Sequence, residues 1–195
     1  MMKILLTLFV LLFSSSVFAD DISDFEIEGM SIGDSLLDNY SYEDILKNIE
    51  KDVYNANKVY FKNKNLYLLT FVNKLKLYSE VQVYIKREDY RFIIQAIDGL
   101  ISYRNNIDSC EKQMIKITNE FSNIFINSNK QKIAPFEHNL DSASIVWGYE
   151  FPLSLKGRAD ITCTDWSDTW TKEKGWYDSL RVGIMTNEIA KLFNY

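Results

Sequence analysis

The chain of 195 residues has little of several residue types on which common functional sites depend. It contains one histidine, two cysteines, two prolines and seven glycines. Zinc binding, and most catalysis by histidine, needs further ligands or an orienting partner, and the sequence shows none around His138. The chain has no glycine-rich phosphate loop and no serine in a nucleophile-elbow pattern. We therefore predict no catalytic, cofactor-binding or metal-ligating residue.

The sequence also lacks an excess of positive charge and a second long apolar run. It has 22 basic and 27 acidic residues, a net charge of −5. Binding to a phosphate backbone needs clustered lysine and arginine, so we predict no nucleic-acid partner. Beyond the first nineteen residues no apolar run approaches the roughly 20 residues that span a bilayer. We expect no stable membrane insertion once that segment is removed.

The first nineteen residues have the layout of a bacterial export signal. Lys3 supplies a short positive start, and residues 4–13 are apolar apart from one threonine. Three serines follow, and small side chains precede the expected cleavage after Ala19. The alternative is an uncleaved anchor, for which the apolar run is short. We predict that residues 1–19 are a signal peptide and that residues 20–195 form a single α+β domain, periplasmic or secreted.

The two cysteines, Cys110 and Cys163, are predicted to form a disulfide. Asp108 and Glu111 have a capping-box-like spacing that opens a helix, and Cys110 lies on its apolar face. Around Cys163 apolar and polar residues alternate, as in a strand with one buried face. A helix packed on a sheet would bring both sulfurs into one layer, and an oxidising compartment favours the bond. The alternatives are two separate buried thiols and, less in keeping with an apolar face, a catalytic cysteine.

The hydrophobic pattern predicts an α+β fold: a mainly antiparallel sheet packed on one long central helix, residues 108–127. A short helical hairpin, residues 31–52, precedes it, because Ser31–Asp34 and Ser41–Asp44 both have capping-box spacing. We expect an irregular stretch over 128–141, a loop over 165–174, and a bulge or bend at Asp98-Gly99. The expected strands cover residues 58–62, 66–72, 80–86, 91–103, 144–151, 157–166 and 177–185, and a closing helix covers 187–194.

Three tryptophans lie within eleven residues near the C-terminus. Trp166, Trp170 and Trp176, with Asp168, form a candidate interaction surface, because exposed indole rings stack on sugars and anchor protein contacts. The alternative is that these rings cover the edge of the core, as large aromatic side chains commonly do. Asp165 and Asp168 are far short of the roughly 6–8 oxygens that calcium takes.

Two resemblances accompany these patterns. Ile27–Ser31, followed by Leu36-Leu37, resembles the opening of SmpA/OmlA-type outer-membrane lipoprotein domains, which begin with a turn into a two-helix hairpin and continue into a three-stranded sheet. Gly33 and the missing lipidation cysteine depart from that pattern. The wider chain is similar to uncharacterised exported proteins of AT-rich marine bacteria. This similarity implies a domain of unknown function with the cysteine pair as a family feature, and rests on 25–34, 36–37, 81–84, 106–110, 160–166 and 180–182.

Together these features favour a non-enzymatic binding or structural module whose partner is an envelope protein or a glycan. One alternative is a periplasmic hydrolase or carbohydrate-active protein, which needs a pocket with at least two acids near His138 or the tryptophans. A second alternative, suggested by the envelope-domain resemblance, is an inhibitor of a periplasmic enzyme.

The export prediction has a direct test. If the first nineteen residues are a cleaved signal, mass spectrometry of the protein exported by a bacterial host will find a mature chain that starts at Asp20. A mass that retains residues 1–19 would instead show an uncleaved anchor.

Overall fold

The computed structural model describes residues 22, 25–56, 65–73, 75–153 and 157–192. The predicted signal peptide and the predicted strand 58–62 therefore lie outside the described residues. Helical segments are η2 (Leu36–Asp38), α1 (Tyr42–Ala56), α2 (Ile107–Ile124), α3 (Asp168–Lys174) and α4 (Asn187–Leu192). Strands are β1 (Leu66–Phe71), β2 (Glu80–Lys86), β3 (Ile94–Ser102), β4 (Gln131–His138), β5 (Asp141–Leu153), β6 (Gly157–Asp165) and β7 (Ser179–Thr186).

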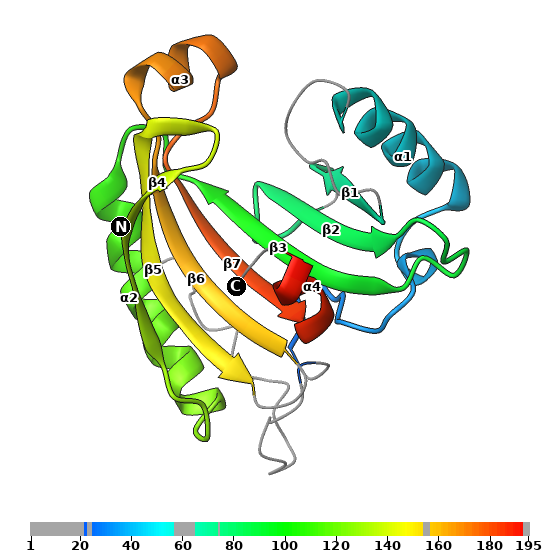
Figure 1. The fold of residues 1–195 in the computed structure, drawn as a ribbon, viewed down its shortest axis with the longest axis horizontal. Helices are drawn as coiled ribbons and strands as arrows, with labels where there is room; N and C mark the ends of the chain where they lie inside the picture. Colours follow the sequence, from blue (N-terminus) through cyan, green and yellow to red (C-terminus); the bar gives the residue numbers. More distant parts are fainter. Residues whose placement is uncertain (1–21, 23–24, 57–64, 74, 154–156, 193–195) are drawn as a thin grey trace, which may run out of the picture.

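The seven strands form one antiparallel sheet in the order β1-β2-β3-β7-β6-β5-β4. The α+β class with a large antiparallel sheet is thus confirmed. Strands β1 to β3 form one meander and β4 to β7 form another, and α2 connects them. The two meanders join where β3 pairs with β7, so β7 lies in the middle of the sheet (Figure 1).

Side chains alternate between a packed face and an open face of this sheet. In β2, Val81, Val83 and Ile85 are buried and their neighbours are only partly buried. In β7 and β6 alternate residues also join the core, although the centres of β3, β7 and β6 are buried on both faces. One core cluster collects the inward residues of the sheet with buried residues of 22–45 and of α2. We call this side the packed face, and the opposite side the open face.

The expectation of one long central helix is not confirmed. Helix α2 packs on β6 and β7, while α1 packs on β1 near the other edge (Figure 1). The reason is geometric: strands are about 4.8 Å apart and a helix with its side chains is about 10–12 Å wide. One helix therefore cannot cover seven strands, and two helices share the packed face.

The N-terminal helical hairpin is not confirmed either. Ser41 and Asp44 do cap α1, since the Asp44 N–H donates to Ser41 Oγ at 3.2 Å. Before it, however, the structure has turns and the three-residue helix η2. Gly29 and Gly33 have φ angles of +79° and +95°, which belong to turns and not to a right-handed helix. The Gly33 N–H also donates to the Ile94 carbonyl at 3.0 Å, which ties this segment to β3.

Other local predictions are corrected where the usual signal is weak. Residues expected to be irregular form the edge strand β4, most of whose side chains are exposed, so it shows no alternation. The loop expected over 165–174 contains α3, between a Ser167 N-cap and a Gly175 C-cap with φ of +71°.

Pro152 does not end β5, because it lies beyond Glu150, the last residue that pairs with β4. Asp98-Gly99 keeps a regular ladder, and the register shift of β3 lies opposite Tyr84/Ile85.

The predicted disulfide is confirmed. Cys110 on α2 and Cys163 on β6 are bonded, with Cα atoms 6.1 Å apart and a sequence separation of 53. Both residues are fully buried. The helix begins at Ile107, one position before the predicted start, and its N-cap is Asn106 rather than Asp108. The bond ties the helix that connects the two meanders to the strand beside the centre of the sheet.

Removing the bond tests its contribution to stability. A loop of this length gives about 4 kcal/mol by chain-entropy arithmetic, so Cys110→Ala/Cys163→Ala should lose roughly that much free energy of unfolding in urea. Wild-type protein treated with a thiol reductant is the control, because it loses the cross-link without losing the buried sulfurs. Coincident unfolding curves with and without reductant would contradict the bond.

Candidate functional site on the open face

The open face presents polar and charged side chains from the centre of the sheet. Among the residues that the structure describes, α4 is the helix that packs there, in a small cluster with Ala96 and Met185 at one end of the strands. The rest of the face follows from the register. One row across the sheet contains Glu150, Asp160, Gly183 and Asp98. The adjacent row contains Gly148, Thr162 and Arg181.

Arg181 on β7 joins the two neighbouring strands through its side chain. Its two terminal nitrogens donate to Asp160 Oδ1 at 2.8 Å and to Asp98 Oδ1 at 2.9 Å. Both carboxylates are almost completely buried, at 2% and 1% exposed, whereas the arginine side chain is 24% exposed. The group therefore has its acids inside and its guanidinium at the surface.

Gly183 makes this arrangement sterically feasible. It lies between Asp160 and Asp98 in the same row. Along β7 it follows Arg181 by two residues, so both face the open side. A Cβ atom there would lie 2.4 Å from Asp98 Oδ1 and 3.0 Å from the nearer atoms of Arg181 and Asp160. The missing side chain leaves the space in which the guanidinium meets both acids.

The buried acids carry an electrostatic penalty. The pKa of Asp98 is raised to about 6, chiefly because the carboxyl is buried; the Arg181 guanidinium opposes this shift, and the neighbouring charge of Asp160 adds to it. The physical cause is that one positive charge serves two carboxylates. When both acids are ionised, the group keeps a net charge of −1 in a poorly solvated place.

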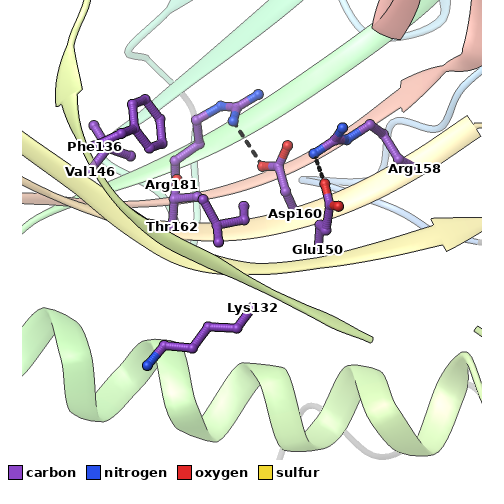
Figure 2. A pocket seen from close by; sticks show the side chains of 9 residues that line it. Lys132, Phe136, Val146, Glu150, Arg158, Asp160, Thr162 and Arg181 are labelled. Atoms are coloured by element: carbon purple, nitrogen blue, oxygen red, sulfur yellow. Dashed lines mark hydrogen bonds and ion pairs between the residues drawn. The ribbon is translucent and has the colours of Figure 1, made fainter. Parts of the chain in front are cut away.

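A pocket of about 250 Å³ opens beside this group. At about 30 Å³ per water molecule, that is room for roughly eight waters. Arg158 and Glu150 form a second ion pair in its wall. Figure 2 shows the Arg181–Asp160 and Arg158–Glu150 contacts facing the same space. The remaining lining residues are Lys132, Ile133, Phe136, Val146 and Thr162.

The charges around this pocket nearly balance. Arg158 and Arg181 face Glu150 and Asp160, Lys132 is a further cation of the lining, and Asp98 beneath Arg181 adds a negative charge when it is ionised. Lys132 runs away from Asp160 toward the side of α2 in Figure 2, as expected from its pairing opposite Tyr149, which packs against the core. The side chains of Phe136 and Val146 supply an apolar wall at the other end (Figure 2). The pocket thus offers hydrogen-bond donors, acceptors and an apolar surface without a dominant charge.

The predicted tryptophan surface is brought together as a cluster. Trp166 contacts Trp170 and Trp176 with ring centroids 6.1 and 5.0 Å apart, and Trp170 contacts Trp176 at 5.9 Å. The His138 ring lies 4.4 Å from the Trp166 ring. All four rings are partly buried, while Asp168 is exposed. The cluster lies around α3, which projects beyond the end of the sheet in Figure 1.

A hydrogen-bond network fixes α3 on the β4–β5 hairpin. The hydroxyl groups of Ser144 and Ser167 both donate to Asp141 Oδ2 at 2.6 Å. The backbone N–H of Trp170 donates to Ser167 Oγ at 3.2 Å. These side-chain bonds lower the pKa of Asp141. Burial lowers the pKa of His138, although the Asp141 charge opposes that shift. His138 is therefore part of a strand end packed on Trp166, and the expectation of a histidine in an irregular surface loop is wrong.

The indole N–H of Trp170 is buried and has no acceptor among the described residues. A buried tryptophan N–H usually finds a partner, and an unsatisfied buried donor costs roughly 1–3 kcal/mol. This donor is unusual for a ring whose purpose is packing alone.

Elsewhere, within the described ranges, no three acidic, cysteine or histidine side chains gather as a metal ion requires, and no helix is long and apolar enough to cross a membrane.

The ion-paired pocket was missed at the level of sequence. One signal was present: Asp160, Thr162 and Thr164 alternate with buried residues and so point away from the core. The sequence pattern instead predicts a bulge or bend at Asp98, and Arg181 is 83 residues away from it in the sequence. Their meeting depends on the pairing of β3 with β7, two strands that are separated in the chain by α2 and strands β4 to β6.

Comparison of the chain with protein-family models, with curated proteins and with solved structures finds no match. The two resemblances drawn from the sequence therefore stay predictions.

The raised pKa of Asp98 predicts a pH dependence. Between the ordinary value of 3.8 and about 6, the folded state binds more protons than the unfolded state, so the free energy of unfolding falls as pH rises. Wild-type protein should therefore lose stability relative to Asp98→Asn between about pH 4 and 6 and show a constant difference above that range. The measurement is urea unfolding at a series of pH values, with the exposed Asp38→Asn as control. Parallel profiles of wild type and Asp98→Asn would contradict the assignment.

Proposed function

We propose that this protein is exported to the bacterial periplasm and acts there as a non-enzymatic binding module. Its binding site in this proposal is the open-face pocket. The layout of residues 1–19 and the Cys110–Cys163 bond support the compartment, because disulfides persist where the environment is oxidising. The partner is an envelope component that presents a polar, uncharged or zwitterionic group.

The observation that carries this proposal is the pair of acids buried around Arg181 next to an open pocket. Desolvating charged groups is expensive, and well-packed apolar residues often stabilise a protein as much as a buried ion pair does. A sheet face needs no such group for folding. Buried charges beside a pocket are characteristic of recognition sites, where preorganised donors and acceptors orient a ligand.

The chemistry of the wall limits the ligand. The two guanidinium groups in the wall are each paired with a carboxylate, so a highly charged polyanion gains little attraction from them. The ion pairs, together with Thr162, supply hydrogen-bond donors and acceptors, and Phe136 with Val146 offers an apolar surface. The volume is below the roughly 300–1,000 Å³ of typical ligand sites, which suits one small polar group.

The hydrolase alternative finds less support. It needs two acids in a cleft near His138 or the tryptophans. The pocket has two acids, Glu150 and Asp160, but each is bound to an arginine, and its lining contains neither His138 nor a tryptophan. This arrangement favours holding a ligand over transferring a proton to it. The inhibitor alternative stays a prediction.

A pocket-filling variant tests the proposal. Thermal shift would be measured with a panel of monosaccharides, amino acids, dipeptides and inorganic phosphate. We expect at least one neutral or zwitterionic compound to raise the melting temperature of wild type and to have no effect on Thr162→Phe, because the new ring occupies the pocket. Gln82→Phe is the matched control, since Gln82 is on the open face in β2 but does not line the pocket. A shift that survives in Thr162→Phe, or no shift with any compound, would count against this site.

A further inference from the structure

The open-face pocket and the tryptophan cluster lie on one path along the strands. In β6, Thr164 follows the pocket residue Thr162 by two, and Trp166 lies just beyond the end of this strand. Successive even steps along a strand stay on the same face. In β4, His138 is the last residue of the strand and lies two positions after the pocket residue Phe136, with a register shift between Glu137 and His138. The contact between the His138 and Trp166 rings shows that both strands end at the same place.

The strand pairings allow the length of this path, from the ion pairs to the tryptophans, to be calculated. Asp160, opposite Glu150, is six residues before Trp166. At about 3.3 Å per residue, the surface from the ion pairs to the tryptophans extends over roughly 20 Å. That is too long for one small ligand and suits a chain of several linked units.

We propose that the open-face pocket and the tryptophan cluster form one elongated site for an uncharged oligosaccharide, a proposal that rests on the pocket being a binding site. A sugar ring presents hydroxyl groups on its edge and C–H groups on its faces. Carboxylates and guanidinium groups bind adjacent hydroxyls through pairs of hydrogen bonds, and aromatic rings pack against the C–H faces. Along the path the ion pairs come first and supply the hydrogen-bonding surface. Phe136 and the indole rings follow and supply the aromatic surface.

The charges near the tryptophans favour a neutral glycan over a nucleic acid. Asp165 and Asp168 are exposed beside the rings, and Asp141 is linked to the same loop through Ser167. These carboxylates repel phosphate groups and accept hydrogen bonds from hydroxyl groups. Lys174 lies over the Trp170 ring, 5.5 Å from its centroid, so its charge is directed at the indole.

The rings are also held in a defined arrangement. Trp166 and Trp170 are nearly parallel, with an angle of 13° between their planes. The Ser167 hydroxyl ties the start of α3 to Asp141, which fixes the loop between these two rings. An ordered pair of indoles loses little conformational entropy when a ligand packs on it, which is what an extended sugar site requires.

The test is a titration of the full exported protein with glucose and N-acetylglucosamine oligomers, β-1,4-linked, from one to six units long. Calorimetry should show affinity rising with length, by at least about tenfold between one and four units. Intrinsic tryptophan fluorescence should shift with the longer oligomers and not with the monosaccharides. Trp170→Ala should remove the gain with length and leave monosaccharide binding unchanged.

Two further variants keep the result interpretable. Trp170→Phe retains an aromatic face and should keep part of the gain, which also covers the case in which Trp170→Ala fails to fold. Trp147→Phe is the matched control, because Trp147 packs against the core on the other face, and it should bind like wild type.

The outcomes separate this proposal from the proposed function. Binding of single units without gain from length, or a gain that Trp170→Ala keeps, would refute the elongated site and leave the pocket standing. Absence of binding by every sugar would refute the elongated site, and only if the thermal-shift panel also gave no response would both proposals be refuted.

Discussion

The paired strands β3, β7 and β6 are the constraint on which the rest of this molecule depends. Their alternate residues face two different environments, since Ile161, Cys163 and Val182 lie in the core while Asp160 and Arg181 lie on the open face. A shift of one residue in any of these pairings would exchange the two sets. The disulfide, the core and the ion-paired group therefore require the same register.

That register also connects stability to the candidate site. The packed face gains its stability from apolar burial beneath α1 and α2 and from a cross-link that involves β6. This support allows the open face to hold Asp98 and Asp160 around one arginine, an arrangement that raises the pKa of Asp98 and adds little stability of its own. A rigid, cross-linked sheet is a suitable base for a preorganised site, because its side chains need little rearrangement when a ligand binds.

Parts of this fold were predictable because their signals are local. Strand β2 alternates without interruption, and its predicted bounds agree with the structure. The cap formed by Ser41 and Asp44 lies within four residues, and the cysteines could be paired from the faces of a helix and a strand. The errors fell where local signals are weak: the exposed edge strand β4, the seven-residue helix α3, and the N-terminal turns, whose backbone bonds to β3.

The sequence by itself determined which residues face inward along the strong strands, that the two cysteines lie in one layer, and that three tryptophans are neighbours. Only the tertiary structure decided that Arg181 meets Asp98 and Asp160, that Gly183 leaves room for them, and that His138 packs on Trp166. The physical reason is the range of the interactions. Periodicity and capping act over a few residues, whereas the open face is assembled from strands far apart in the chain, whose pairing depends on the sheet as a whole.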